Sequence, residues 1–224
     1  MRYAYNISDM SFWQRFCNYL HYKRNKILAV GFASLGMLCL LGYYLTCEIT
    51  SGWAYFRNNP LDIWNFAIAL FAYGVILVCN LRNDSMAYQG ITLFVFYTAF
   101  SAALNFIQGA ITSVIYSAMG QTTGIIIDVF YGLLWAATAV IGIMLYIYIY
   151  KYMAGRYVSW TKIRVFSILY ACLLGVWAAL MIWIDCLYIG YVDFAVLVIL
   201  TALPLSEFFI GVSIIFTLER LRRV

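Results

Sequence analysis

Six long, nearly uncharged apolar segments constrain the fold of this chain more than any other feature. Each is long enough for a helix to cross a bilayer core of roughly 30 Å, which takes about 20 apolar residues. Because lipid cannot satisfy backbone polar groups, such segments span as α-helices. The sequence therefore predicts an all-α polytopic membrane protein whose six transmembrane helices cover 27–47, 61–81, 90–116, 123–150, 163–186 and 193–218.

Composition agrees with this class. Of the 224 residues, 66% are hydrophobic and only 10% are charged, and the mean hydropathy is +0.88. A soluble domain is about 45–50% apolar and about 25% charged, so this chain has too few charges to cover a surface in water. The predicted organisation is an N-terminal segment over 1–26, a transmembrane domain over 27–218 and a basic tail over 219–224.

The basic residues indicate the orientation. When the predicted helices alternate, thirteen of the fourteen Lys and Arg residues, all except Arg57, fall on one face. Lys and Arg concentrate on cytoplasmic loops, so both termini are predicted to be cytoplasmic, in a multi-pass protein of the cell membrane. This distribution explains the net charge of +5, so the predicted partner is the lipid bilayer and binding to nucleic acid is not predicted.

The N-terminal segment carries aromatic residues at helical spacing, with Asp9 or Ser11 as the capping residue. It predicts a short amphipathic helix in the cytoplasmic headgroup region, and an ordinary aromatic lead-in is the alternative. The apolar run that follows is too long for a signal peptide, and no small-residue cleavage site comes after it. The run is therefore expected to be retained as the first span.

Two cysteines, Cys47 and Cys186, fall at predicted outer ends of the first and fifth spans. They could form a disulfide if those helices are neighbours in an oxidising compartment, and two unrelated buried thiols are the alternative. No Cys-x-x-Cys pair occurs, so neither a redox motif nor a zinc motif is predicted.

Two consecutive spans carry stripes of polar and small residues at steps of three and four, which puts each stripe on one helix face. The stripe of the third span is Thr98, Ser101, Asn105, Gln108 and Thr112. The stripe of the fourth span is Gly124, Asp128, Tyr131, Trp135, Thr138 and Gly142. As antiparallel neighbours joined by a short uncharged loop, the two helices would bring their stripes together.

These stripes have two interpretations. In the first they hold helices together, each interhelical hydrogen bond contributing about 0.6–2 kcal/mol. In the second they line a solute cavity, whose substrate-binding residues would be Asn105, Gln108, Asp128, Tyr131 and Trp135.

Glu207 is placed about fourteen residues into the last span, hence roughly 20 Å deep. A charge at such depth costs at least about 2.5–3.5 kcal/mol. Pro204 removes a backbone hydrogen bond and kinks the helix, an arrangement found where transporters bind solutes or ions. The sequence predicts a gating or coupling element of Thr201, Pro204 and Glu207, and a Glu packed against an Asn or Tyr of a neighbouring helix is the alternative.

Catalytic motifs are not found in the sequence. The single histidine, His21, lies outside the spans, and there is no metalloprotease, nucleophile-elbow or P-loop motif. The chain is therefore predicted not to be an enzyme and to hold no cofactor or metal. Any use of ATP would require a separate ATPase subunit.

Three segments, "LDIWNFAIALFAYGVILVCNLRNDSMAYQG", "GAITSVIY" and "GIIIDVFYGLL", resemble the PnuC group of small aromatic-rich permeases for nicotinamide riboside. The chain departs from that group by an apparent insertion between these pieces and by lacking a clear paired-tryptophan motif. Its size and "AVGFA", with Ala29 and Ala33 in the first span, also resemble substrate-binding subunits of energy-coupling-factor vitamin importers, although the second span lacks their Gly/Pro-rich character. Either resemblance implies an aromatic-lined vitamin site.

The function predicted from these features is a membrane transporter or solute-binding subunit for a small aromatic or vitamin-like molecule. The alternative is a non-catalytic membrane subunit or scaffold, such as the permease part of a larger complex.

Overall fold

The computed structural model describes residues 11–118, 125–187 and 194–222, and the side chains of these residues except 116–118, 125–128, 184–187 and 194–200. Long helices make up nearly all of this part, and no strand occurs in it. They are α1 (Phe12–Thr50), α3 (Pro60–Arg82), α4 (Ala87–Ala118), α5 (Ile125–Met153), α6 (Trp160–Leu187) and α7 (Phe194–Leu221). One further helical turn, α2 (Tyr55–Asn58), joins α1 to α3. Within the described residues, six helices are long and apolar enough to cross a membrane, which confirms the predicted fold class.

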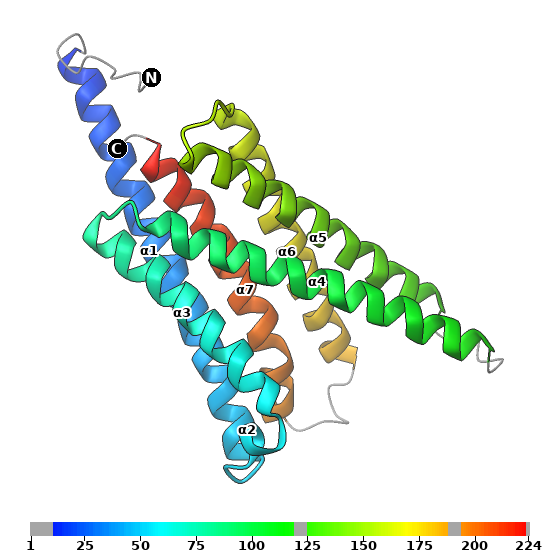
Figure 1. Ribbon diagram of the computed structural model, residues 1–224. Helices are drawn as coiled ribbons and strands as arrows, with labels where there is room; N and C mark the ends of the chain where they lie inside the picture. The colour runs from blue at the N-terminus through cyan, green and yellow to red at the C-terminus, as the bar shows by residue number, and fades with distance from the viewer. Residues whose placement is uncertain (1–10, 119–124, 188–193, 223–224) are drawn as a thin grey trace.

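The two ends of the bundle differ in which connections they carry. The start of α1, the end of α7 and the connections α3–α4 and α5–α6 lie at one end, here called the terminal end (Figure 1). α2 lies at the opposite end, here called the α2 end. Lys151 and Arg156 are therefore at the terminal end, and Arg57 in α2 is at the other. This arrangement is what an even number of spans requires, and which end faces the cytoplasm remains a prediction.

Local sequence explains where the first helices begin. The Ser11 side chain accepts a hydrogen bond from the Gln14 backbone N–H, and the Gln14 side chain accepts one from the Ser11 N–H, so a capping box opens α1. Pro60 occupies the first turn of α3, where its missing N–H costs nothing. The N-terminal residues predicted to form a separate short helix are instead continuous with the first span, because α1 runs unbroken over 39 residues.

α7 packs between α1 and α6, and small residues let the three helices approach closely. A Cβ added to Gly36 of α1 would lie 2.8 Å from a side-chain carbon of Ile210 in α7. In the same way, a Cβ on Gly175 of α6 would lie 3.0 Å from the ring of Phe208. The Ser213 hydroxyl of α7 also donates a 2.7 Å hydrogen bond to the carbonyl of Ala29.

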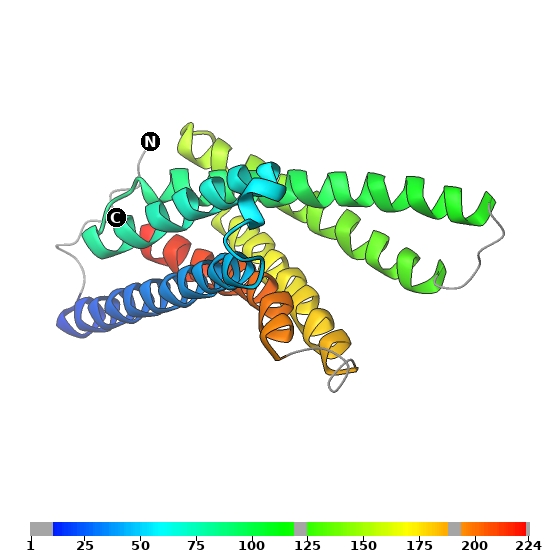
Figure 2. The ribbon, with the colours of Figure 1, turned by 90° about the horizontal axis from the view of Figure 1, so that it is seen from below.

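α4 and α5 form an antiparallel hairpin, as predicted from their short connection. Their closest approach is at Gly142, where an added Cβ would lie 2.8 Å from the Cβ of Ala99. From there toward Ala118 and Ile125 the hairpin leaves the bundle (Figures 1 and 2). The ends of α4 and α5 nearest Ala118 and Ile125 therefore lie away from the other helices, whereas Tyr131 and Trp135 of α5 still contact Trp177 of α6.

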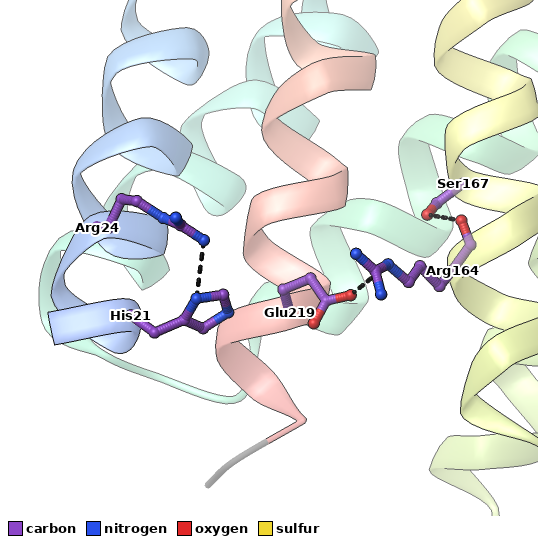
Figure 3. Close-up of polar contacts among 5 residues, drawn as sticks. All are labelled: His21, Arg24, Arg164, Ser167 and Glu219. Carbon is purple, nitrogen blue, oxygen red and sulfur yellow. Dashed lines mark hydrogen bonds and ion pairs between the residues drawn. The ribbon is translucent and has the colours of Figure 1, made fainter. Parts of the chain in front are cut away.

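Charged side chains at the terminal end make local contacts (Figure 3). Arg164 Nε of α6 lies 3.1 Å from Glu219 Oε1 of α7, and the Ser167 hydroxyl donates to the carbonyl of Arg164 at 2.9 Å. In α1, Arg24 Nη2 lies 2.8 Å from His21 Nδ1. Because the Arg164 side chain is 58% exposed, its ion pair with Glu219 contributes only about 0–1 kcal/mol.

Candidate solute-binding cavity

A cavity of about 360 Å³ lies among the spans, and α1, α3, α4, α5, α6 and α7 all contribute to its lining. Asp62, in the first turn of α3, and Tyr43, in the last third of α1, place it in the half of the bundle nearer the α2 end. Small-molecule sites typically have volumes of about 300–1,000 Å³. The cavity is thus large enough for a small solute.

Four of the residues singled out in the sequence border this cavity. Asn105 contributes from α4, Trp135 from α5, and Pro204 with Glu207 from α7. These residues are separated by up to about a hundred positions in the chain. They border one cavity although the described parts of α5 and α7 do not pack against each other. Of the remaining stripe members, Thr98, Ser101 and Thr138 also line it.

The other predicted site residues lie elsewhere. Gln108 is exposed and does not line the cavity, because the α4–α5 hairpin has left the bundle at that turn. Tyr131 stands behind the lining, with its ring centroid 5.7 Å from that of Trp177. Thr201 is half-buried and is not part of the lining. The backbone of Asp128 is in α5, but its side chain lies outside the described residues.

The sequence did not single out Asp62 as a cavity residue. The Tyr55 hydroxyl donates a 2.5 Å hydrogen bond to Asp62 Oδ2, and the Asn65 amide donates to Oδ1 at 3.2 Å. Burial, together with the hydrogen bond to Asp62, raises the pKa of Tyr55, so its phenol keeps the proton that it donates. The carboxylate is thereby held in place at the α2 end of the cavity.

Aromatic rings cover much of the cavity wall. Trp135 and Trp177 pack with ring centroids 4.4 Å apart, and Tyr73 meets Phe94 edge-on at 5.5 Å. The aromatic residues of the lining are Tyr43, Tyr44, Tyr73, Phe94, Tyr97, Trp135 and Trp177. A ligand in this space would therefore contact ring faces and edges from all the spans except α7.

Glu207 differs from Asp62, because no hydrogen bond or ion pair from the described residues reaches its carboxylate. Its accessible surface borders the cavity. The neighbouring Ser206, by contrast, is bonded to Tyr73 across the helix interface, with 3.2 Å between the two hydroxyl oxygens. The predicted alternative, a Glu207 satisfied by Asn or Tyr of another helix, is not found in the described part of the chain.

The predicted disulfide between Cys47 and Cys186 required α1 and α6 to be neighbours. Their described parts do not pack against each other, because α7 lies between them. Cys47 is a free, buried thiol, and the Cys186 side chain lies outside the described residues. The arrangement of helices thus removes the condition on which the pairing depended.

In the part of the chain that the structure describes, no three His, Cys, Asp or Glu side chains lie close enough together to hold a metal ion. The cavity instead combines two carboxylates, amides, hydroxyls and aromatic rings, which are groups that bind organic molecules.

No protein-family model matches the sequence, and neither a curated protein nor a solved structure is significantly similar to it. The resemblances to permeases and vitamin importers remain expectations from the sequence.

Proposed function

We propose that this integral membrane protein binds a small solute in the cavity between its spans and moves it across the bilayer. The observation that carries the proposal is the cavity itself, to which every long helix contributes. Thr98 bonds to the hydroxyl of Tyr170 in α6, as a residue that only holds helices together would. If the whole stripe had that role alone, Ser101 and Asn105 would also meet partner side chains without an intervening void. They border about 360 Å³ of space instead.

The lining also has the composition of a ligand site. Such sites are mostly apolar and aromatic, with a few polar groups that fix the ligand's orientation. Here the rings of Trp135 and Trp177 offer stacking surfaces, and Asn65 and Asn105 offer amide groups. An aromatic or vitamin-like solute, as the sequence resemblances imply, would use both kinds of contact.

Pro204 supplies a place at which α7 can bend. It lies inside the helix, and a proline cannot donate the hydrogen bond to the carbonyl four residues earlier. Since Pro204 and Glu207 both border the cavity, a change of angle at this point would alter the site directly. We assign to these residues, with Thr201 one turn earlier, the gating or coupling role.

The test is whether a solute-sized reagent enters the cavity. Ser101→Cys places a thiol on the cavity wall, and Ala139→Cys places one on α5 at a packed position that is only 6% exposed. With the purified protein in lipid vesicles, neutral methyl methanethiosulfonate should modify the first thiol at least about tenfold faster than the second, as measured by peptide mass spectrometry. Equal slow rates would mean that the cavity is closed to solutes, and the proposal would then be wrong.

Solute identity can be found with the same variant. Vitamins and nucleosides that raise the unfolding temperature of the unmodified protein should lose this effect once the Ser101→Cys thiol has been blocked. A solute that stabilises both forms equally binds elsewhere.

One observation favours the alternative role as a subunit of a larger complex. Gln108 is an exposed amide on a span, on the part of α4 that has left the bundle. Amide side chains on transmembrane helices usually bond across to another helix. A partner subunit beside this hairpin would supply that contact, and cross-linking through Gln108→Cys in membranes would detect it.

A further inference from the structure

The charged residues that line the cavity are all acidic. Two carboxylates, Asp62 of α3 and Glu207 of α7, border the cavity, and none of its described lining residues is Lys, Arg or His. In a low-dielectric interior a charged ligand binds well only beside an opposite charge. An anionic solute would meet two acids and no base, so this lining disfavours anions.

The two carboxylates are not equivalent. Asp62 already accepts hydrogen bonds from Tyr55 and Asn65. Glu207 accepts none from the described residues, although it lies inside the bundle. A buried carboxylate without a partner is costly, and a cation in the adjoining space would remove that cost. Of the two carboxylates, that of Glu207 is therefore the one available to pair with a cationic ligand.

The rings around Glu207 fit the same type of ligand. Tyr73 of α3, Tyr97 of α4 and Trp135 of α5 share the cavity with it. Tyr97 borders the same cavity as Asp62 as well. The faces of aromatic rings carry negative potential, and cages of such rings bind ammonium and quaternary ammonium groups.

We propose that the cavity selects a small organic cation, an amine or quaternary ammonium compound. Its charged group pairs with Glu207 against the rings of Tyr73 and Tyr97, and its body extends toward Asp62. The assignment rests on the proposed function, because it requires the cavity to be open to solutes. The assignment adds two points to the proposed function: the solute is positively charged, and Glu207 is the residue that binds its charge.

The experiment compares reagents of opposite charge at one cavity thiol. Ser101→Cys is treated with the trimethylammonioethyl and the sulfonatoethyl methanethiosulfonate, and modification is followed by mass spectrometry of the peptide that contains residue 101. Each rate is divided by the rate of the same reagent with a free thiol in solution. The ratio of these two values cancels any change in the reactivity of the introduced thiol.

The cationic reagent should be favoured by at least about tenfold, a factor within the range of one ion pair or cation–π contact. Adding Glu207→Gln should bring the ratio close to one. Adding Glu219→Gln should leave it unchanged, because Glu219 is on the same helix but bonds to Arg164 at the terminal end (Figure 3).

The outcomes separate the two proposals. If neutral methyl methanethiosulfonate reacts readily but the charged reagents show no preference, or the sulfonate is favoured, the cavity is a solute site and the cation assignment is wrong. A cation preference that persists in Glu207→Gln would overturn the role of Glu207. Loss of the preference in Glu219→Gln would assign it to an acid outside the cavity and would overturn that role as well. If the neutral reagent fails as well, the proposed function itself is wrong.

Discussion

Individual polar side chains hold α3 and α7 together inside the bundle. Asn80 and Thr217 are both fully buried, and the Asn80 amide donates 2.8 Å hydrogen bonds to Thr217 Oγ1 and to the carbonyl of Ile76. Thr217 in turn donates to the carbonyl of Ser213. The Asn80–Thr217 bond thus links α3 to α7 through residues 137 positions apart in the chain, although Asn80 Oδ1 has no hydrogen-bond partner among the described residues.

The link between Asn80 and Thr217 should be measurable. In a double-mutant cycle of Asn80→Ala and Thr217→Val, we expect a coupling energy of about 0.6–2 kcal/mol, the range for interhelical hydrogen bonds in membranes. The free energy of unfolding would be measured by titration with sodium dodecyl sulfate in mixed micelles. As a control, Thr92→Val removes a hydroxyl that bonds only to carbonyls of its own helix, and Asn80→Ala combined with it should be additive. Additivity in the Thr217 cycle as well would contradict the expectation.

At this scale the sequence revealed one cavity acid and missed the other. Glu207 was recognisable because its depth in a span makes a carboxylate costly whatever surrounds it. Asp62 lies in the first turn of α3, where an acid can reach the interface cheaply, so its position indicated nothing about function. Only the rotation of α3, which turns Asp62 and Asn65 inward toward Tyr55, distinguishes it.

Pairs of helices are set by small residues at their crossings. Gly142 of α5 is the tightest example in the α4–α5 hairpin, since an added Cβ would meet Ala99 at 2.8 Å and the Tyr170 ring at 3.3 Å. Gly132, on the same helix, has only the ring of Phe106 at 3.8 Å, which is an ordinary contact. The two glycines are on the same helix and differ in the space around them, so they form a matched pair for substitution.

Gly142→Ala should therefore destabilise the protein by about 1–3 kcal/mol, because α4 and α6 must both move to admit the methyl group. Gly132→Ala adds the same methyl group where there is room, and it should be neutral or slightly stabilising through its helix propensity. Thermal unfolding of both variants in the same detergent would check this difference. Equal effects would mean that the hairpin does not depend on the contact at Ala99.

The helices were largely predictable, and their divergence was not. Length and apolarity alone fix the spans, and Ser11 and Pro60 mark their starts, because these properties are local. α2 was missed because it is a single turn whose first backbone N–H groups, those of Tyr55 and Phe56, donate to the carboxylate of Glu48 at the end of α1, and no local sequence pattern indicates this contact. Gln108 was misplaced for a related reason: periodicity shows which residues share a face of α4 but not where that face leaves the bundle.

For the molecule as a whole, the remaining question is which end faces the cytoplasm. Among the described residues, all Lys and Arg except Arg57 lie at or near the terminal end, so this end of the bundle is strongly basic. From the charge rule we predict that the terminal end faces the cytoplasm and the α2 end faces outward. In that orientation the cavity lies in the outward half, with Asp62 nearer the outside than Glu207.

This orientation can be tested with two exposed positions that carry no charge, Asn58 in α2 and Ala154 just after α5. A membrane-impermeant maleimide applied to intact cells should label Asn58→Cys and not Ala154→Cys, and permeabilisation should expose the second thiol. The unsubstituted protein gives the background from exposed native thiols such as Cys17. The opposite labelling pattern would mean that the protein has the opposite orientation, with the cavity in the cytoplasmic half. Labelling of both thiols in intact cells would contradict the three spans, α3, α4 and α5, that separate Asn58 from Ala154 along the chain.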